Sequence, residues 1–268
     1  MANIHATAVV DPQAKLGADV EIGPFCVIGP HVELGDGVVV HSHAAIVSRT
    51  ALGAGCKVFP FVSLGQAPQD VKFGDEPSTL TIGPGTLIRE HVTINPGTAR
   101  GHMTTKVGAN CFLMIGSHIA HDCEIGDNVT LVNGATLGGH VSVGEGAIIG
   151  GLSAVHQYVR IGAYAFVGGM SGVAADLIPF GLAMGNRAHL SGLNIVGLKR
   201  KGFPREQIHE LRQAYRMLFA TEGTLKERLE DVEAMFARNP LAKQIIDFIK
   251  THSERSFCVP NNAAVPSR

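Results

Sequence analysis

The fold of this chain is decided by residues 107–173, which read VGANCFLMIGSHIAHDCEIGDNVTLVNGATLGGHVSVGEGAIIGGLSAVHQYVRIGAYAFVGGMSGV. Every sixth residue of this stretch is aliphatic without a miss: Val107, Leu113, Ile119, Ile125, Leu131, Leu137, Val143, Ile149, Val155, Ile161, Val167 and Val173. A period of six is neither helical nor the simple alternation of a strand. It is typical of a solenoid in which short strands alternate with corners and one aliphatic side chain per unit points to the axis.

The same period covers the N-terminal part of the chain. Eleven consecutive positions follow it: Ile4, Val10, Leu16, Ile22, Ile28, Leu34, Val40, Ile46, Leu52, Val58 and Leu64. After a break at residues 66–79 the pattern resumes in phase at Ile82, Ile88 and Ile94, and a second break at about residues 98–106 shifts the phase by one residue. We expect both breaks to be looped-out insertions, which commonly carry function on a rigid scaffold. Three units to a coil predict about eight or nine coils and a prism about 40 Å tall.

The repeat ends after Val173. Residues 174–198 hold Pro179 and four glycines and are expected to form an irregular crossover. The predicted domains are therefore a β-helix over residues 1–185 and, over residues 186–268, a crossover followed by a three-helix domain. This mainly β architecture resembles the left-handed parallel β-helix of hexapeptide-repeat proteins, with a C-terminal α-helical domain added.

Three helix starts are recognisable in the C-terminal part. They are Pro204 in a first turn, the capping-box pair Thr224 and Glu227, and Asn239 before Pro240. The tail from Ser256 is expected to be frayed.

Composition and charge argue against several classes of protein. The net charge of −1 argues against bulk binding of nucleic acid. The five cysteines are odd in number and include no Cys-x-x-Cys pair, which predicts a reduced, cytoplasmic protein without a thiolate metal site. The N-terminus has no basic segment followed by an apolar one, and no run approaches the ~18 apolar residues of a membrane span. We therefore expect neither secretion nor membrane insertion by the chain's own signal.

Histidines gather at one predicted edge of the prism. Residues three units apart lie one above the other, so His121 lies below Gly139 and Asp122 lies below His140. A single histidine at an exposed corner needs no function, but three in a column beside a carboxylate favour a site. The residues predicted at or near this edge are His118, His121, Asp122, His140, His156 and Gln157.

The residue types at this edge suit general-base chemistry. Imidazole takes up and returns a proton near neutral pH, and a neighbouring carboxylate can hold its tautomer and stabilise the imidazolium. Gly138 and Gly139 offer backbone N–H groups that suit an oxyanion, although corner geometry alone accounts for glycines there. The sequence contains no GxSxG elbow, Walker loop, dinucleotide fingerprint or HExxH motif, and no covalent nucleophile stands out.

Five segments carry a resemblance that runs over essentially the whole chain. They are His-Ile-Ala-His-Asp-Cys at 118–123, Gly-His-Val-Ser-Val at 139–143, Ala-Val-His-Gln at 154–157, Pro-Gln-Asp-Val-Lys at 68–72 and Asn-Ile-Val-Gly-Leu-Lys-Arg-Lys-Gly-Phe at 194–203. Together they resemble the acyl-[acyl-carrier-protein]–UDP-N-acetylglucosamine O-acyltransferase family, which opens lipid A synthesis. The resemblance implies a homotrimer with active sites between neighbouring prisms. It also implies acyl carrier protein and UDP-N-acetylglucosamine as partners, and no cofactor beyond the phosphopantetheine that delivers the acyl chain.

The resemblance implies a role for each site residue. His121 would remove the proton from the glucosamine 3-hydroxyl as that oxygen attacks the acyl thioester. Asp122 would orient the site, and the Gly139 N–H would stabilise the oxyanion. Asn194 and Arg200 would reach the nucleotide. The cleft for the sugar nucleotide and the acyl-pantetheine would be lined by Gln69, Asp70, Lys72, His118, His140, His156 and Gln157.

The resemblance also implies how chain length is measured and where the acyl donor docks. An acyl-length ruler would fall on Gly169, where the absent side chain should leave a deep groove for a longer 3-hydroxyacyl chain. Phe166 and Met170 could shorten that groove. A basic end that could dock acidic acyl carrier protein, or form an ordinary solvated surface, comprises Lys199, Arg200, Lys201, Arg205, Arg212 and Arg216.

Two positions depart from the family pattern. Asn95-Pro96 stands where many members carry a His-Arg pair, and Arg187 stands where a histidine is common. We therefore do not expect these residues to make the contacts with the phosphates or the acyl tail that the family pattern would imply.

Other functions remain open from the sequence alone. A zinc-dependent carbonic anhydrase can use the same β-helix with three interface histidines, but its usual histidines five apart are missing here. Another alternative is a family member that acylates a 3-amino sugar nucleotide in place of the hydroxyl sugar. The N-acyltransferase of the same pathway normally has an extra N-terminal domain, whereas the repeats here begin at residue 4. A non-catalytic scaffold would leave the cluster at 118–122 unexplained.

Overall fold

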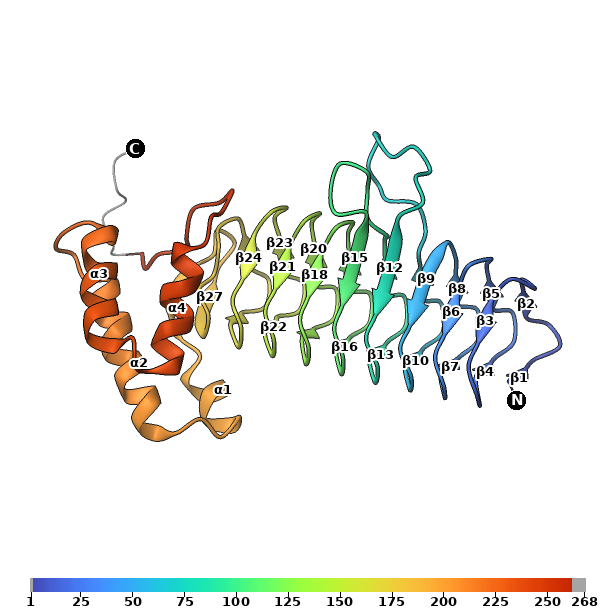
Figure 1. Cartoon of the computed structure of the whole chain (residues 1–268), viewed down its shortest axis with the longest axis horizontal. Coiled ribbons are helices and arrows are strands. Elements are labelled where there is room, and N and C mark those ends of the chain that lie inside the picture. The colour runs from blue at the N-terminus through green and yellow to red at the C-terminus, as the bar shows by residue number, and fades with distance from the viewer. Residues whose placement is uncertain (1, 262–268) are drawn as a thin grey trace.

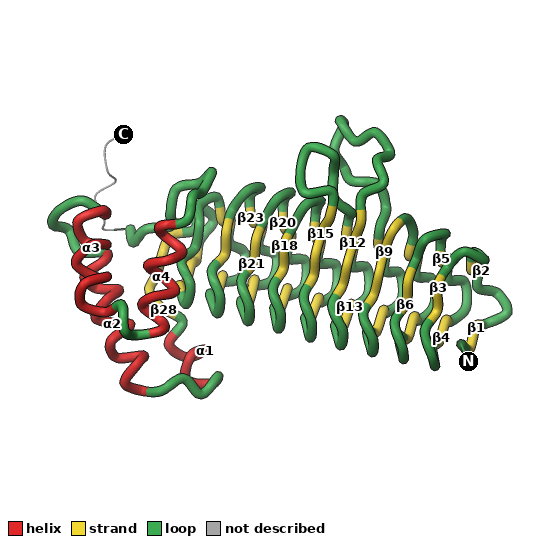
Figure 2. The backbone as a smooth tube through the Cα atoms, in the orientation of Figure 1, coloured by secondary structure: helices red, strands yellow, loops and turns green. Residues whose placement is uncertain are grey.

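The chain forms a long three-sided prism followed by a bundle of helices (Figure 1). This computed structural model describes residues 2–261. Short strands wind around the prism axis, and each turn of the chain adds one strand to each of three parallel sheets, which we call A, B and C (Figure 2). This is the left-handed parallel β-helix that the six-residue period predicts.

Sheet A contains β1 (Asn3–Ile4), β4 (Glu21–Ile22), β7 (Val39–Val40), β10 (Lys57–Val58), β13 (Leu87–Ile88), β16 (Phe112–Leu113), β19 (Thr130–Leu131), β22 (Ile148–Ile149), β25 (Phe166–Val167), β27 (Gly181–Met184) and β28 (His189–Leu193). Sheet B contains β2 (Val9–Val10), β5 (Val27–Ile28), β8 (Ala45–Ile46), β11 (Ser63–Leu64), β14 (Thr93–Ile94), β17 (His118–Ile119), β20 (Thr136–Leu137), β23 (Ala154–Val155) and β26 (Gly172–Val173). Sheet C contains β3 (Lys15–Leu16), β6 (Glu33–Leu34), β9 (Arg49–Leu52), β12 (Thr79–Ile82), β15 (Thr104–Val107), β18 (Glu124–Ile125), β21 (Ser142–Val143) and β24 (Arg160–Ile161).

The aliphatic residue of each unit ends its strand and points to the axis. Strands of successive coils pair so that these residues lie in register, as Ile119 does with Leu137 in sheet B. Both side chains are fully buried, and burying one such side chain stabilises the fold by about 1.5–3 kcal/mol. Ile4 in the first coil is 43% exposed, because no coil lies beneath it. The predicted core of stacked aliphatic residues is confirmed.

The two insertions leave the prism at the same edge. We call the turns from a strand of sheet B to the next strand of sheet C the B–C corner. Residues 65–78 connect β11 to β12 and residues 95–103 connect β14 to β15, and the two loops project side by side (Figure 1). Both therefore lie on the corner that carries His121. The insertions were expected to end at residue 79 and at about residue 106. Both expected ends were wrong, because Thr79 and Thr104 already pair with each other in sheet C.

The C-terminal part contains one helix more than expected. Its helices are α1 (Ile195–Arg200), α2 (Arg205–Leu218), α3 (Leu225–Phe236) and α4 (Pro240–Lys250). The predicted helix starts are confirmed, including the capping box of Thr224 with Glu227. The irregular crossover expected at 174–198 was wrong, because β27 and β28 form an antiparallel hairpin on sheet A and α1 follows it. The expected domain boundary at residue 185 falls in the turn of this hairpin. None of the helices within residues 2–261 has the length and apolar character that a membrane crossing needs.

The segment after α4 returns to the prism. The backbone N–H of Asp176 donates to Ser256, and the N–H of Cys258 donates back to Asp176. The N–H of Leu190 also donates to the carbonyl oxygen of Val259. The frayed tail expected from Ser256 was therefore wrong for residues 256–259, because ladder bonds hold this segment. Residues 262–268 of the expected tail lie outside the described residues.

Candidate active site

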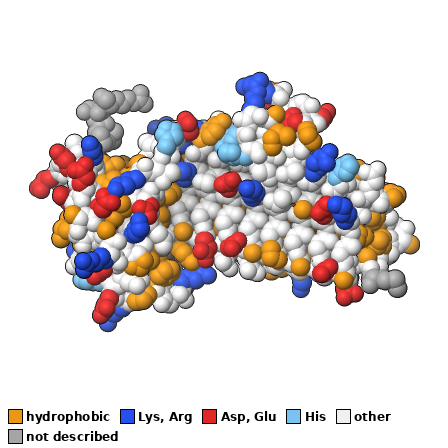
Figure 3. Space-filling view, viewed as in Figure 1, with side chains coloured by type: hydrophobic (Ala, Val, Ile, Leu, Met, Phe, Trp, Pro, Cys, Tyr) orange, Lys and Arg blue, Asp and Glu red, His pale blue; other side chains and the backbone are white. Residues whose placement is uncertain are grey.

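The predicted histidine column is present at the B–C corner. His121 and His140 meet edge to face, with their ring centroids 5.1 Å apart. Tyr158 of the next coil stacks on His140 with centroids 4.4 Å apart. A methyl group placed on Gly139 would lie 2.6 Å from Cε1 of His121, so a side chain there would displace the ring. Histidine side chains show at this edge beside the projecting loops (Figure 3).

His121 is paired with a carboxylate. Its Nδ1 lies 2.8 Å from Oδ2 of Asp122. Because an ionised carboxylate only accepts hydrogen bonds, Nδ1 carries the hydrogen, and Nε2 of the neutral ring keeps its lone pair. The His121 side chain is 17% exposed, whereas that of Asp122 is fully buried. The pair therefore presents a proton acceptor at the surface and keeps its negative charge inside.

Three hydrogen bonds from the second insertion hold the Asp122 carboxylate. Oδ1 accepts from the backbone N–H groups of Thr98 and His102, at 3.1 and 2.8 Å. Oδ2 accepts from Oγ1 of Thr98 at 2.7 Å, in addition to His121. Burial would raise the pKa of Asp122, but the hydrogen bonds from Thr98, His121 and His102 outweigh burial and hold that pKa below its ordinary value. The carboxylate is therefore ionised at neutral pH.

The two insertions are fastened to each other as well as to Asp122. Nδ2 of Asn95 donates to the carbonyl oxygens of Gln66 and Ala67, at 3.0 and 3.3 Å. The backbone N–H of Ala99 donates to Oε1 of Glu76 at 2.7 Å. Asn95, one of the departures from the family pattern, is thus buried and joins the loops. Both loops are held at the edge where His121 is exposed.

Two further histidines of the site favour the neutral form. Burial lowers the pKa of His118, whose Nδ1 lies 2.7 Å from Oγ1 of Thr93. Burial also lowers the pKa of His140, and the negative charge of Asp122 only partly opposes this effect. Neutral imidazoles can either donate or accept a hydrogen bond, which suits the binding of polar substrate groups.

The expected loop residues lie on the first insertion. Gln69 and Lys72 are exposed, and Asp70 is half-buried. Oδ1 of Asp70 accepts a hydrogen bond from the backbone N–H of Lys72 at 3.0 Å, which fixes the turn between them. The loop thus presents three polar side chains near the B–C corner.

Two family models match the chain. The model described as UDP N-acetylglucosamine O-acyltransferase, domain 2, matches residues 176–258. The bacterial transferase hexapeptide model, of six repeats, matches residues 13–48 and 104–139.

Named relatives and solved structures cover nearly the whole chain. The acyl-[acyl-carrier-protein]–UDP-N-acetylglucosamine O-acyltransferase of Azorhizobium caulinodans is 53% identical over 265 residues, which are 99% of this chain and 98% of that relative. The protein of the same name from Caulobacter vibrioides is 51% identical over 258 residues, 96% of this chain and 98% of its own. This chain belongs to that O-acyltransferase family. The solved UDP-N-acetylglucosamine acyltransferase of Francisella novicida is 35% identical, with a TM-score of 0.93 over 97% of this chain and 95% of that one.

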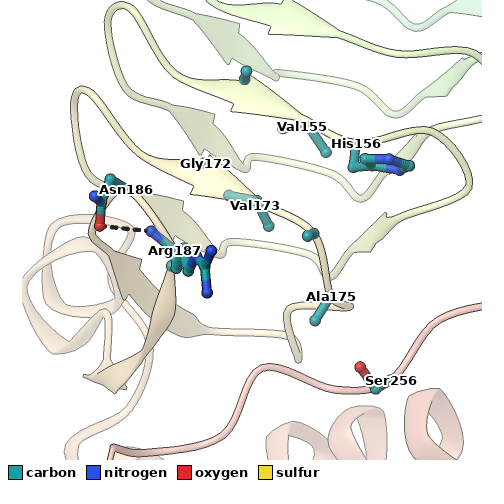
Figure 4. Close-up of a pocket in the computed structure, with 11 residues that line it drawn as sticks. Val155, His156, Gly172, Val173, Ala175, Asn186, Arg187 and Ser256 are labelled. Atoms are coloured by element: carbon teal, nitrogen blue, oxygen red, sulfur yellow. Dashed lines mark hydrogen bonds between the residues drawn. The ribbon is translucent and has the colours of Figure 1, made fainter.

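A cavity that the sequence did not reveal opens beyond the column. Its volume is about 500 Å³, and it lies against the last strands of sheet B. Alanine and valine side chains form much of its wall, while His156, Arg187 and Ser256 approach it from different elements (Figure 4). The cavity escaped sequence analysis because its wall joins the last coils, the β27–β28 hairpin and the C-terminal segment.

Other residues expected in the O-acyltransferase site lie away from His121 in the single chain. Gly169 and Met170 form a corner between sheets A and B, and Phe166 lies on β25 of sheet A. Asn194 caps α1, where its Oδ1 accepts from the N–H of Gly197 and its Nδ2 donates to the carbonyl oxygen of Tyr164, both at 3.0 Å. Arg200 lies exposed in the last turn of α1.

The geometry also bears on a metal at this site. Ligand atoms of His121, Asp122 and His140 lie within 4.8 Å of one another, and within residues 2–261 this cluster does not include His156. A metal would have to displace hydrogen bonds that already occupy both oxygens of Asp122. Burial raises the pKa of Cys123 to about 12, so its thiol is neither a thiolate ligand nor a ready nucleophile. The arrangement therefore favours proton transfer by His121.

Proposed function

We propose that this chain transfers a 3-hydroxyacyl group from acyl carrier protein to the 3-hydroxyl of UDP-N-acetylglucosamine, the reaction that opens lipid A synthesis. The observation that carries the proposal is the pairing of accessible His121 with buried, ionised Asp122 in a chain of the O-acyltransferase family. Such a pair supplies a general base of fixed tautomer.

The reaction follows from this pair. Nε2 of His121 takes the proton of the sugar hydroxyl as its oxygen attacks the thioester carbonyl. A C–O bond forms, and the carbonyl electron pair moves onto oxygen. No hydrogen bond found within residues 2–261 uses the Gly139 N–H, which is therefore free to stabilise this oxyanion. Collapse breaks the C–S bond, and the imidazolium returns its proton to the departing pantetheine thiolate, while Asp122 stabilises the imidazolium.

The remaining site residues support a site shared between chains. Gly169 lies at the corner between sheets A and B. Asn194 caps α1 and bonds to Tyr164, which lies between sheets C and A, so neither residue stands beside His121 within one chain. A homotrimer in which the B–C corner of one chain faces its neighbour would bring the proposed nucleotide residues, Asn194 and Arg200, to His121. The side chain of Asn194 already makes two local hydrogen bonds, so its contribution would be to place α1 and Arg200.

The acyl donor would contact two regions of the chain. The basic end at α1 and α2 is exposed and would dock acyl carrier protein, although acidic and basic side chains are interspersed over the helical part in Figure 3. Gly169 is exposed, and a methyl group placed on it would meet only backbone, 3.3 Å away at the nearest atom. Met170 is 74% exposed beside it. These features fit an open acyl-length ruler. Because the carrier protein supplies the phosphopantetheine, the proposal needs no resident cofactor, and we place the enzyme in the cytoplasm.

A transfer assay with the full chain tests the proposal. Carrier proteins loaded with 3-hydroxyacyl chains of graded length would be mixed with UDP-N-acetylglucosamine or its 3-amino analogue. Transfer to the hydroxyl sugar with one preferred length supports the proposal. Transfer to the amino sugar alone would change the acceptor. No transfer, combined with stoichiometric zinc in protein purified without chelator, would replace the proposal with a zinc enzyme.

A further inference from the structure

The segment Ser253–Val259, which we call the C-terminal strap, reaches the B–C corner one coil beyond His140. Its Arg255 donates from Nε to the carbonyl oxygen of Gln157 at 3.0 Å. Nη2 of the same guanidinium lies 2.8 Å from Nδ1 of His156. Two residues expected to line the substrate cleft are thus held by an arginine nearly a hundred positions away in sequence.

The strap is anchored on both sides of Arg255. Oγ of Ser253 donates to Oδ2 of Asp176 at 2.6 Å and accepts from the backbone N–H of Arg255 at 3.0 Å. Asp176 is fully buried and also accepts from Nε of Arg160 at 2.6 Å. The backbone N–H of Cys258 donates to Asp176 on the other side. The side chain of Arg255 therefore extends from a backbone segment that is held in place. Its contact with His156 is specific for that reason.

The donor chemistry of arginine determines the proton position on His156. A guanidinium has five N–H donors and no acceptor. Nδ1 of His156 must therefore accept the bond from Arg255, which places the ring hydrogen of the neutral imidazole on Nε2. The same contact excludes a hydrogen on Nδ1, so the nearby Gln157 carbonyl oxygen, 3.2 Å away, receives no bond from the ring. His156 is left with a single donor, its Nε2–H.

His156 stands at the edge of the largely apolar cavity of Figure 4. Val155, Val173 and Ala175 contribute to the wall and offer no hydrogen-bonding side chain. An apolar chain that carries an occasional carbonyl or hydroxyl oxygen, as acyl-pantetheine does, would use one donor at this edge. We infer that Arg255 is a positioning residue, which holds His156 in its Nε2–H tautomer as a hydrogen-bond donor to the acyl donor. This inference rests on the proposed function.

Kinetics of Arg255 variants test the inference. Arg255→Gln should raise the KM for the 3-hydroxyacyl carrier protein about two- to tenfold, because it weakens one hydrogen bond between neutral groups. The KM for UDP-N-acetylglucosamine should stay unchanged. Arg255→Lys keeps a donor-only cation and should return the donor KM toward wild type. Arg238→Gln removes the same charge from an exposed turn between α3 and α4 and should leave both constants unchanged.

A spectroscopic readout separates positioning from mere support of the strap. Long-range ¹H–¹⁵N spectra of the full chain, with His156 assigned from its loss in His156→Gln, should show the Nε2–H tautomer in wild type. In Arg255→Gln the two tautomers should mix. A wild-type His156 with its hydrogen on Nδ1, or a folded Arg255→Gln with an unchanged donor KM, would overturn the inference. Absence of transfer by wild type would reject the proposed function instead, and the tautomer can be measured in either case.

Discussion

Nδ1 of His121 and Oδ2 of Asp122 lie 2.8 Å apart across the boundary between the surface and the interior of the prism. The buried partner holds the charge and fixes the tautomer, while the accessible partner exchanges the proton. Thr98 and His102 bind the same carboxylate. The base, the prism and the second insertion are therefore joined at one carboxyl group.

Asp122→Asn should reduce both turnover and stability. An amide cannot accept all four hydrogen bonds, and its NH₂ group would face an existing donor. We expect the transfer rate to fall about 10²- to 10⁴-fold, as for a disabled general base. The free energy of unfolding should fall by about 1–3 kcal/mol. Asp127→Asn is the matched control, because Asp127 lies at an exposed corner and its Oδ1 accepts a hydrogen bond from the N–H of Ala109. Wild-type turnover in folded Asp122→Asn would contradict the assigned role.

Thr98→Val tests the link between the insertion and the carboxylate. The substitution keeps the shape of the side chain and removes the Oγ1 hydrogen bond to Asp122. We expect the free energy of unfolding to fall by about 1–3 kcal/mol in chemical denaturation. The transfer rate should fall less than in Asp122→Asn, because the backbone N–H groups still bind the carboxylate. Thr136→Val on the exposed face of sheet B should change neither quantity. Equal behaviour of the two valine variants would argue against the link.

Much of the prism was predictable because one sequence period determines it. Each aliphatic residue, such as Ile119, is buried by the residue one coil away, so a local pattern specifies a contact between coils. The hairpin β27–β28 and the strap were not predictable in this way. Their pairing partners, such as Asp176 for Cys258, lie far away in sequence, and no period links them.

Ile125→Ala tests the source of stability. Ile125 is buried between Val107 and Val143 in sheet C. The lost methyl groups and the cavity left behind should cost about 2–5 kcal/mol in the free energy of unfolding. Val71→Ala, on a fully exposed side chain of the first insertion, should change it by less than about 0.5 kcal/mol. Similar losses in the two variants would show that the stacked core does not dominate stability.

Stability should fall as the solution is acidified. The folded chain lowers the pKa of His118 and of His140 from the ordinary value of 6.5, so the unfolded chain takes up protons first. The contribution of these two histidines to the free energy of unfolding is complete above pH 6.5. It is lost as the pH falls from there through the pKa values of the folded chain. Asp122, whose pKa is lowered from 3.8, adds a further loss at lower pH.

Denaturation midpoints measured from about pH 8 to about pH 5 would show this loss. A variant with His118→Gln and His140→Gln should depend less steeply on pH over the same range. A wild-type midpoint that is constant across it, or an equally steep double variant, would exclude these histidines as the cause.

The site was predictable only in part, because the six-residue period specifies contacts between coils but not the paths of the loops. The stacking of His121, Asp122, Gly139 and His140 follows from the period. The bonds from Thr98 to Asp122 come from a loop, whose path no repeat specifies. Arg255 reaches His156 from beyond α4. Its role depends on the strap, for which the sequence shows no pattern.

The most direct test of the account is the transfer rate of His121→Ala measured beside wild type and His31→Ala, with UDP-N-acetylglucosamine and the preferred 3-hydroxyacyl carrier protein. His31 occupies an exposed turn of the same B–C corner in an early coil and serves as the matched histidine. We predict a loss of at least about 10² to 10⁴ in rate for His121→Ala, and a wild-type rate for His31→Ala. His121→Ala should stay folded, with a loss of stability no larger than that of Thr98→Val, because each removes one hydrogen bond to Asp122. A folded His121→Ala that transfers acyl groups at the wild-type rate would contradict the assignment of His121 as the base.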